Sequence, residues 1–422
     1  MDAFSCGIDV SNFEVISCGN TSVKHLLYAD DILVFGKASI SNADMLNEAL
    51  SIFADHSGLK IDKLCSKFLF HGSVAAKKLH LVSWKKTSTP KCCGGLGLPS
   101  INSLQFAHGV SFLWRYYNFD TIVGDWLRAK YSSPYKPLLV RASKFWKFIS
   151  STASKVKGDL AFHVSSINCN LSMLWDPWCA GFAVSELSQG HLLNNYTVKE
   201  FISDGRWSFS NWSAFPLLNR ITYVPILNGP IHAVTWIGSS NPVFKTFYMK
   251  FYSDLETVHW YKFVWHKNTA LRHSAYVWLT LLDGLKTADI LAKRNIVINP
   301  VCPLCRKEAE SIVHCFFQCA HTFAVISSLI PLFRNFLLPP TLLQLFDFID
   351  GNRRLHNFEK EFCYFVICCT VYYLWRDRNT LRFTASKNTV QDSIRRIIHA
   401  IKVKTFNWKR IELLKVAFPS CF

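Results

Sequence analysis

Residues 302–319 place three cysteines and a histidine at a spacing that is typical of a metal site. Cys302 and Cys305 enclose a Pro-Leu pair, His314 follows after eight residues, and Cys319 after four more. A Cys-x-x-Cys turn points two thiolates at one metal, and a later His and Cys can complete the tetrahedron that Zn²⁺ prefers. Because all four positions are protein ligands, the pattern predicts a structural zinc site that folds a small helical module.

The identity of the fourth ligand depends on the path of the chain after His314. Residues 308–317 are expected to form a helix, and at about 100° per residue His314 and Cys319 would then point roughly 140° apart. They can share a metal only if the helix unwinds near Gln318. Cys315 and Cys319 share a helix face without this unwinding, so Cys315 is the alternative ligand. Accidental spacing is the remaining interpretation, since the chain has 15 cysteines and 15 histidines.

Short helices are predicted on the N-terminal side of this cluster. Apolar residues at helical spacing indicate a helix near 275–282, which ends at the following Asp-Gly pair. Thr287 is placed to cap a second helix that runs to about Asn295. Pro300 then breaks the chain just before the Cys-x-x-Cys turn, which would aim the two thiolates.

The charge balance predicts a polyanionic partner. The chain has 47 Lys and Arg against 29 Asp and Glu, a formal net charge of +18. The simplest partner is RNA or DNA, bound with low sequence specificity. An inert basic surface is the other interpretation, because the charges are spread along the chain. The densest groups are Lys77-Lys78, Lys85-Lys86, Arg353-Arg354, Arg395-Arg396, Lys402, Lys404, Lys409 and Arg410.

The cysteine count and the N-terminus indicate an intracellular, reducing location, nuclear or cytoplasmic. The number of cysteines is odd, and the first residues lack the basic start and apolar run of a secretion signal, so a secreted disulfide framework is not expected. The longest apolar stretch, 362–375, is short for a bilayer span and is followed at once by Arg376. It is therefore predicted to be a buried or amphipathic helix, with no membrane partner. A protein partner is unknown.

Two adjacent carboxylates stand out near the N-terminus. Asp30 and Asp31 lie between the apolar runs 25–29 and 32–35, which predicts a strand, a tight turn and a second strand. Adjacent carboxylates at a hairpin tip repel each other unless a cation is bound, and Mg²⁺ prefers oxygen ligands. The plain alternative is that Asp-Asp is an ordinary turn pair.

Two further motifs are assigned structural roles. Residues 94–97 read Gly-Gly-Leu-Gly and predict a tight turn; this spacing fits neither a Walker loop nor a dinucleotide-binding fingerprint, so a phosphate loop is not expected. Residues 175–178 read Trp-Asp-Pro-Trp and predict a turn held by two indoles. A catalytic role for Asp176 is not expected, because no partner carboxylate is near it in sequence.

The sequence Tyr-Ala-Asp-Asp at 28–31, between apolar runs, resembles the catalytic hairpin of reverse transcriptases. Other segments resemble non-LTR (LINE-type) retrotransposon polyproteins, particularly those of plants, and they occur in the same order. The resemblance, including that to the reverse-transcriptase zinc-binding domain, covers about residues 20 to 385. These segments are Ser57–Ile61, Trp84 with Pro90-Lys91 and Gly94–Leu98, Trp175–Trp178, the cluster 302–319, and Trp375–Asn379.

The resemblance implies roles for several residues and also shows departures. In that family the two hairpin carboxylates work with a third on an earlier palm strand to hold two Mg²⁺ ions. Asp2 and Asp9 precede the hairpin here, but neither lies in a strand-like apolar run. Asp30 and Asp31 are therefore interpreted as a remnant without activity, and Mg²⁺ is expected only if polymerase activity were intact. The resemblance favours His314 as the fourth zinc ligand.

The expected fold class is α+β, with a short palm-like β-hairpin fragment followed by mostly helical regions and a helical zinc-binding module. The chain is expected to be truncated relative to the family, without fingers, endonuclease and most of the thumb. The predicted domains are a palm fragment at 1–70, a post-palm helical region at 71–160, an irregular Trp-rich connecting region at 161–260, the zinc-binding module at 262–330, and a helical basic C-terminal region at 331–422.

Three functional hypotheses follow. The first is a non-catalytic remnant of a LINE-type reverse transcriptase, with a structural zinc module and general nucleic-acid affinity. The second is a fragment of an RNA-directed DNA polymerase that is active only with its missing N-terminal palm and fingers. The third is a domesticated scaffold whose zinc module binds protein. Binding that falls steeply with salt favours the first over the third, because phosphate contacts release counterions.

Overall fold

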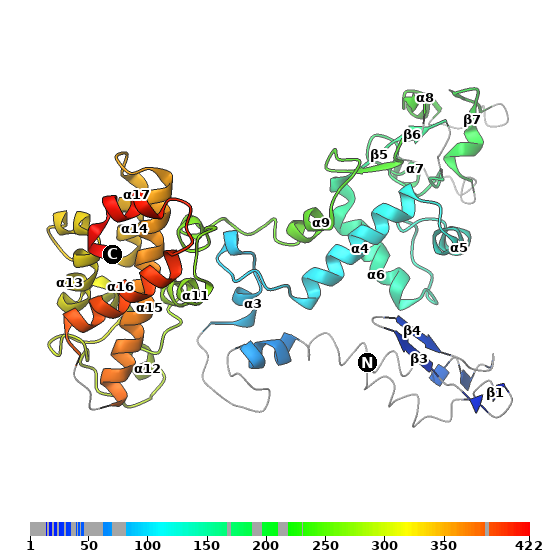
Figure 1. The fold of residues 1–422 in the computed structure, drawn as a ribbon. Helices are drawn as coiled ribbons and strands as arrows, with labels where there is room; N and C mark the ends of the chain where they lie inside the picture. Colours follow the sequence, from blue (N-terminus) through cyan, green and yellow to red (C-terminus); the bar gives the residue numbers. More distant parts are fainter. Residues whose placement is uncertain are drawn as a thin grey trace. The chain divides into compact units, whose positions relative to one another are not determined.

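Two compact units make up the chain in the computed structural model (Figure 1). The first unit comprises residues 1–99 and 255–422, and the second comprises residues 100–254. Helices dominate both units, and the strands within the described residues form only two-stranded sheets, which confirms the α+β, mostly helical class. The structure describes residues 14, 17–18, 21–22, 25–28, 31–34, 39, 41–42, 44–45, 62–69, 82–166, 170–187, 196–209, 218–229, 231–384 and 388–422.

The predicted N-terminal hairpin is present as two paired strands. Strand β3 (His25–Tyr28) runs antiparallel to β4 (Asp31–Val34), with Tyr28 opposite Asp31. A shorter pair, β1 (Ser17–Cys18) and β2 (Thr21–Ser22), precedes it. Asp30 lies outside the described residues, as do residues 57–61. Asp31 is described only as the first residue of β4.

The second unit is organised around a long helix, α4 (Ile101–Asn118), which packs against α6 (Lys144–Val156) and α9 (Phe244–Lys250). Ser100 begins α4, because its hydroxyl accepts a hydrogen bond from the Ser103 amide at 3.2 Å. The other elements are α5 (Ile122–Tyr131), η2 (Lys157–Asp159), β5 (Leu160–Phe162), β6 (Val164–Ser165), α7 (Val184–Leu187), η4 (Val198–Phe201), β7 (Ile202–Ser203), β8 (Arg206–Trp207), α8 (Leu218–Thr222), β9 (Ile226–Leu227) and β10 (Val234–Trp236). The pairs β5–β10 and β7–β8 are antiparallel, and β6–β9 is parallel.

Asp176 of the Trp-Asp-Pro-Trp segment is a buried structural carboxylate. Tyr117 donates a hydrogen bond to its Oδ1 at 2.7 Å, and the Ser133 hydroxyl donates to the same oxygen. Its Oδ2 accepts from the Ser172 amide at 2.6 Å. Burial raises the pKa of Asp176 to about 6, despite these hydrogen bonds. The carboxylate thus ties α4 to the turn.

We expect the second unit to become more stable as the pH falls from above 6 to about 4. The pKa of Asp176 is about 6 in the folded chain and about 3.9 when unfolded, so the folded state binds the proton more tightly in this window. The gain is about 3 kcal/mol at most, and Asp176→Asn should remove this part of the pH dependence. Hydrogen-exchange protection of peptides from 101–118 and 171–187 measures it. Equal pH dependence in the two proteins would contradict the assignment.

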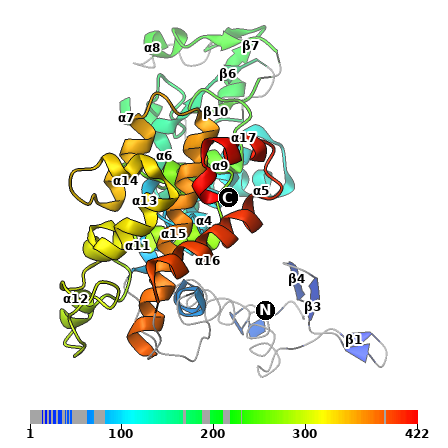
Figure 2. The ribbon, with the colours of Figure 1, turned by 60° about the vertical axis from the view of Figure 1, so that its left-hand side comes forward.

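The C-terminal part of the first unit is built around α15 (Asn357–Phe383), which runs through the surrounding helices (Figures 1 and 2). The predicted apolar helix at 362–375 lies inside α15, where most of its side chains are buried. Among the described residues, none of the helices combines the length and the apolar character needed to span a bilayer. The elements packed against α15 are α10 (Tyr261–Val264), α11 (Leu271–Leu281), α13 (Ala320–Leu329), α14 (Leu342–Gly351), α16 (Val390–Thr405) and α17 (Ile411–Ala417).

The Gly-Gly-Leu-Gly segment is a packed turn between α3 (Trp84–Thr87), η1 (Lys91–Cys93) and the C-terminal helices. A Cβ on Gly95 would lie 2.0 Å from the backbone oxygen of Thr89, so only glycine fits. The amides of residues 94–97 all donate to backbone oxygens, and the Gly94 oxygen accepts from Trp278 Nε1 at 3.0 Å. The turn therefore has a structural role, as predicted, and no amide is left to bind phosphate.

Candidate metal centre

The Cys-x-x-Cys turn lies at the tip of a small backbone-paired loop. Val301 and Ala309 form an antiparallel bridge, and the Cys302 amide donates to the Glu308 oxygen at 2.8 Å. The Glu310 amide donates to the Pro300 oxygen at 2.7 Å. Residues 308–311 are therefore the second arm of this loop, and the helix predicted to begin at Glu308 begins at 312 instead.

The helix that carries His314 unwinds before it reaches Cys319. Residues His314–Gln318 form a wide turn, η5, in which Phe316 (φ −119°, ψ 77°) and Phe317 (φ 109°, ψ 0°) leave helical geometry. Cys319 is extended (φ −71°, ψ 131°), and α13 begins at the next residue. A metal shared by His314 and Cys319 was predicted to require unwinding near Gln318, and the unwinding occurs one to two residues earlier. A positive φ at a non-glycine residue costs about 1–3 kcal/mol, and such strain is common at functional sites.

This unwinding brings the four predicted ligands together. The ligand atoms of Cys302, Cys305, His314 and Cys319 all lie within 4.8 Å of one another. Cys302 and Cys319 are fully buried, and His314 is 6% exposed. In tetrahedral zinc with bonds of about 2.0–2.3 Å, ligand atoms are separated by about 3.3–3.8 Å. Three thiols and one imidazole at this spacing, with Cys305 half-buried and the other three buried, fit Zn²⁺.

Cys315, the alternative ligand, contacts the centre without joining the four-residue group. Its Sγ lies 3.7 Å from Glu310 Oε1, on the side away from solvent. The Cys315 thiol also donates a hydrogen bond to Cys302, and this bond, with a second from Cys319, lowers the pKa of Cys302. The same contact and burial raise the pKa of Cys315. One thiolate is therefore favoured within the cluster before a metal arrives.

Glu308 orients the imidazole of His314. Glu308 Oε2 lies 3.3 Å from His314 Nδ1, while His314 Nε2 lies 3.4 Å from the Cys305 sulfur. Nδ1 therefore faces the carboxylate, and Nε2 is the atom that faces the cysteines. A carboxylate behind a metal-binding histidine fixes its tautomer and ring direction.

Glu310 joins the loop to α15 through buried charge pairs and to a second helix through a backbone amide. Its carboxylate accepts from Arg378 Nε and Nη2, each at 2.6 Å, and from Arg382 Nη2 at 2.8 Å. It also accepts from the Ala288 amide at 2.7 Å, at the start of α12 (Ala288–Ala292). The side chain of Glu310 is 0% exposed and that of Arg378 is 2% exposed. This network fixes the loop against α15.

Residues 375–379, one of the segments that resemble the retrotransposon polyproteins, make structural contacts. Arg378 lies over the Trp375 ring at 4.8 Å and pairs with Glu310. Asp377 accepts from the Ser393 hydroxyl at 2.6 Å and pairs with Arg396 at 2.9 Å. Sequence reasoning did not identify the two glutamates of the loop. Their spacing gives no signal, because residues two apart in an extended arm are expected on the same face, whereas Glu308 is exposed and Glu310 is buried.

Part of this chain matches a known protein family. Residues 243–325 match the family described as zinc-binding in reverse transcriptase, and this range includes all four candidate ligands. A protein of Arabidopsis thaliana named "Putative ribonuclease H protein" is 22% identical over 297 residues, which cover 64% of this chain and 47% of that protein. The chain thus spans about half the length of this curated relative. The segment 243–325, with the candidate metal centre inside it, is thus similar to the reverse-transcriptase zinc-binding family.

Proposed function

We propose that the chain is a retroelement-derived, LINE-type reverse-transcriptase remnant that binds RNA or DNA and holds one structural zinc ion. The observation that carries this proposal is the closed group of Cys302, Cys305, His314 and Cys319 within the matched family segment. Four protein ligands leave no position for a water molecule, so the metal has a folding role. The resemblance to non-LTR elements supports the wider assignment.

Zinc would stabilise the loop in a conformation that the backbone does not favour alone. The strained Phe317 sits between two ligands, His314 and Cys319. A bound metal supplies ligand bonds only when both side chains converge, so its binding energy offsets the strain. The Glu308 carboxylate lies beside the imidazole of His314, and the Cys315 thiol lies beside Cys302. The surrounding residues therefore support a metal-binding arrangement of the four ligands.

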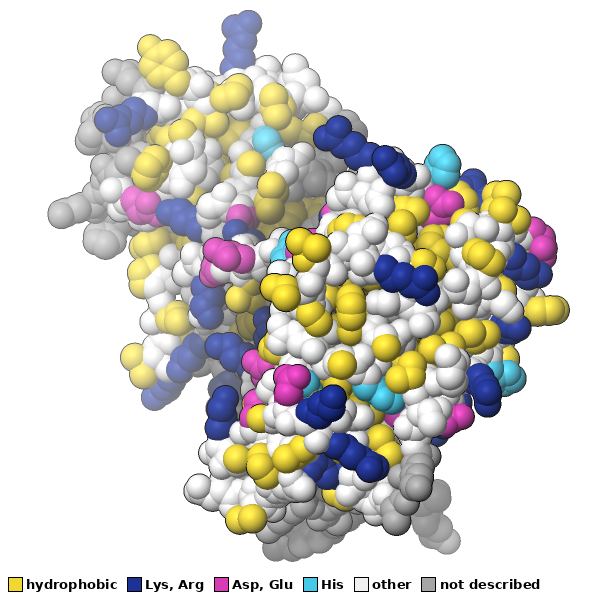
Figure 3. Space-filling model, turned by 90° about the vertical axis from the view of Figure 1, so that its left-hand side faces the viewer, with side chains coloured by type: hydrophobic (Ala, Val, Ile, Leu, Met, Phe, Trp, Pro, Cys, Tyr) yellow, Lys and Arg dark blue, Asp and Glu magenta, His cyan; other side chains and the backbone are white. Residues whose placement is uncertain are grey.

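The net charge of +18 supports the nucleic-acid part of the proposal. Figure 3 shows Lys and Arg side chains scattered among hydrophobic ones over one face. Scattered cations attract phosphates without reading base edges, which predicts low sequence specificity. The name of the Arabidopsis relative and the reverse-transcriptase description of the matched family point to the same class of partner.

Polymerase activity is not part of the proposal. The Asp30-Asp31 pair follows a segment in which no carboxylate lies in a strand-like apolar run. Two-metal phosphoryl transfer needs carboxylates that hold both ions against the primer and the nucleotide. The hairpin by itself therefore supplies only part of such a site.

We expect these 422 residues to bind RNA and DNA oligonucleotides of mixed sequence with similar affinity, and with affinity that falls about tenfold or more between 50 and 200 mM salt. Fluorescence anisotropy at the two salt concentrations measures this dependence.

The same protein should not extend a primer on an RNA template above the level of its Asp30→Ala variant. Salt-insensitive binding would contradict the nucleic-acid role, and extension above the variant would contradict the absence of catalysis.

A further inference from the structure

A groove with clustered cations crosses the C-terminal part of the first unit. It consists of two adjoining cavities of about 730 and 560 Å³ that share Lys267, Asn268 and Trp408. Six cations line it against one carboxylate, that of Glu361. We call it the basic groove; its cations are Lys267, Arg272, Arg376, Lys404, Lys409 and Arg410.

The cations of the basic groove are largely free of acidic partners. Among the described residues, the one carboxylate within 4.0 Å of any of them is Glu361, at 4.0 Å from Lys267. By contrast, Arg395 and Arg396, which sequence reasoning grouped with this region, pair with Asp392 at 3.8 Å and Asp377 at 2.9 Å. The structure thus separates cations that hold the fold from cations that remain available for a ligand.

The first turn of α11 lines the larger cavity, and no side chain caps this end of the helix. Ala270 is the N-cap residue, no side chain caps the helix, and no acidic residue lies in its first turn. In the described part of the chain, the amides of residues 271–273 have no acceptor. Uncapped amides and the helix dipole favour an anion at this position.

A second polar group in the same cavity lacks a partner. His273 is 5% exposed and lines the cavity, and its buried Nδ1 has no hydrogen-bond partner within the described chain. Its ring lies tilted against that of Tyr372, with centroids 4.8 Å apart. Polar groups of the first turn of α11, the amides and this ring nitrogen, are thus without partners in the described chain.

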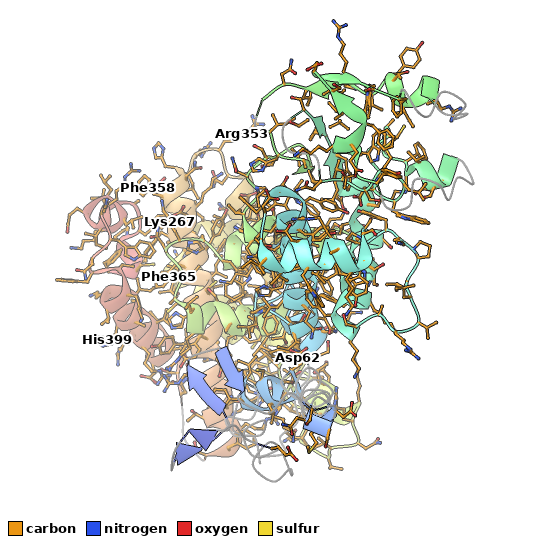
Figure 4. The ribbon with its side chains drawn as sticks, turned by 90° about the vertical axis from the view of Figure 1, so that its right-hand side faces the viewer. Asp62, Lys267, Arg353, Phe358, Phe365 and His399 are labelled. Carbon is orange, nitrogen blue, oxygen red and sulfur yellow. The ribbon has the colours of Figure 1, made fainter. Side chains whose placement is uncertain are left out.

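Aromatic side chains lie beside the cations. Arg376 lies over the rings of Tyr372 and Tyr373, at 5.8 and 5.7 Å. Tyr373 and Trp408 are half-buried and line the cavity, so part of each ring faces it. Figure 4 labels Lys267, Phe358 and Phe365, which line the groove. Alternating cations and ring faces are typical of surfaces that bind single-stranded nucleic acid.

We propose that the basic groove is the binding site for a single strand of RNA or DNA, with a backbone phosphate at the start of α11. This inference rests on the proposed nucleic-acid role and assigns it to one surface. Cavities of a few hundred Å³ admit units the size of a small molecule, about 300–1,000 Å³. A flexible strand can place one nucleotide in such a recess, whereas the phosphates of a duplex lie on a convex rod.

Charge removal tests this assignment in the full chain. The variant Lys267→Gln/Arg376→Gln/Lys404→Gln should weaken binding of a mixed-sequence strand of about 16 nucleotides by about tenfold or more, and reduce the salt slope by about two. The control Lys293→Gln/Arg294→Gln/Arg353→Gln removes the same charge from exposed sites outside the groove and should change affinity less than about threefold. Equal losses in the two variants would overturn the groove assignment while the general nucleic-acid role stands.

A second pair of variants separates ligand repulsion from folding. Ala270→Asp and Ala270→Asn both supply a cap for α11, so neither should weaken the helix. Only the aspartate places a negative charge where the phosphate is expected, so it should weaken strand binding about tenfold more than asparagine does. Equal binding by the two, or a duplex competitor as effective as the strand, would overturn the proposal. A wild-type chain that binds no oligonucleotide would refute the proposed function itself.

Discussion

Cys302→Ser and Cys319→Ser are expected to abolish zinc binding and to destabilise the first unit by about 3–5 kcal/mol, lowering its melting temperature by about 10 °C. Each cysteine is fully buried within the group whose ligand atoms lie within 4.8 Å of one another. A serine at either position leaves three ligands and a buried hydroxyl without the metal. Zinc content by mass spectrometry and thermal unfolding of the full chain measure the two effects.

Cys315→Ser is the matched control for these variants. Cys315 is equally buried and contacts both Cys302 and Glu310, but it stands outside the four-residue group. We expect it to retain zinc and most of its stability. If Cys315→Ser abolished zinc binding while His314→Ala did not, the centre would have four cysteine ligands, and the assignment of His314 would be wrong.

Glu310→Leu is expected to destabilise the first unit by about 3–5 kcal/mol, because it leaves Arg378 as a buried charge without its partner. The Arg378 side chain is 2% exposed, and both of its bonds to Glu310 are 2.6 Å long. Hydrogen-exchange protection of peptides from α12 and α15 measures the loss. Because Glu310 accepts hydrogen bonds from the Ala288 amide of α12 and from Arg378 of α15, protection should fall in both helices.

Two further variants show whether the loss comes from the charge pair. The double variant Glu310→Leu/Arg378→Met should cost less than the sum of the two single changes, since it removes both buried charges. Glu308→Gln should cost less than about 1 kcal/mol, because that carboxylate is 67% exposed. Additive costs in the double variant would contradict a direct Glu310–Arg378 interaction.

The sequence predicted the parts of the fold that depend on local patterns. The hairpin at 25–34, the apolar helix within α15, the stop at the Asp-Gly pair after α11 and the glycine turn all follow from short-range signals. The arm at 308–311 was wrongly assigned to a helix, because its partner residues, 300–302, lie before the Cys-x-x-Cys turn. The backbone hydrogen bonds between the two arms of the loop outweigh the local helix preference of the second arm.

The sequence predicted which four side chains come together at the candidate centre, but not the residues that support them. The spacing of the cysteines and His314 requires a break in the helix, and the structure contains that break at Phe316 and Phe317. The partner of Glu310 is 68 residues away, so no local pattern indicates it. The same holds for the basic groove, whose cations come from three separate segments. Charge counting along the chain grouped paired and unpaired arginines together.

The most direct test of the central claim is the zinc content of the purified full chain, measured together with its fold after chelation. We expect one zinc ion per chain, removed by a strong chelator with loss of hydrogen-exchange protection across 300–330 and lower thermal stability of the first unit. Restoring zinc should restore both. A chain that contains less than about half an equivalent of zinc, and keeps its protection and stability in chelator, would contradict a structural zinc centre.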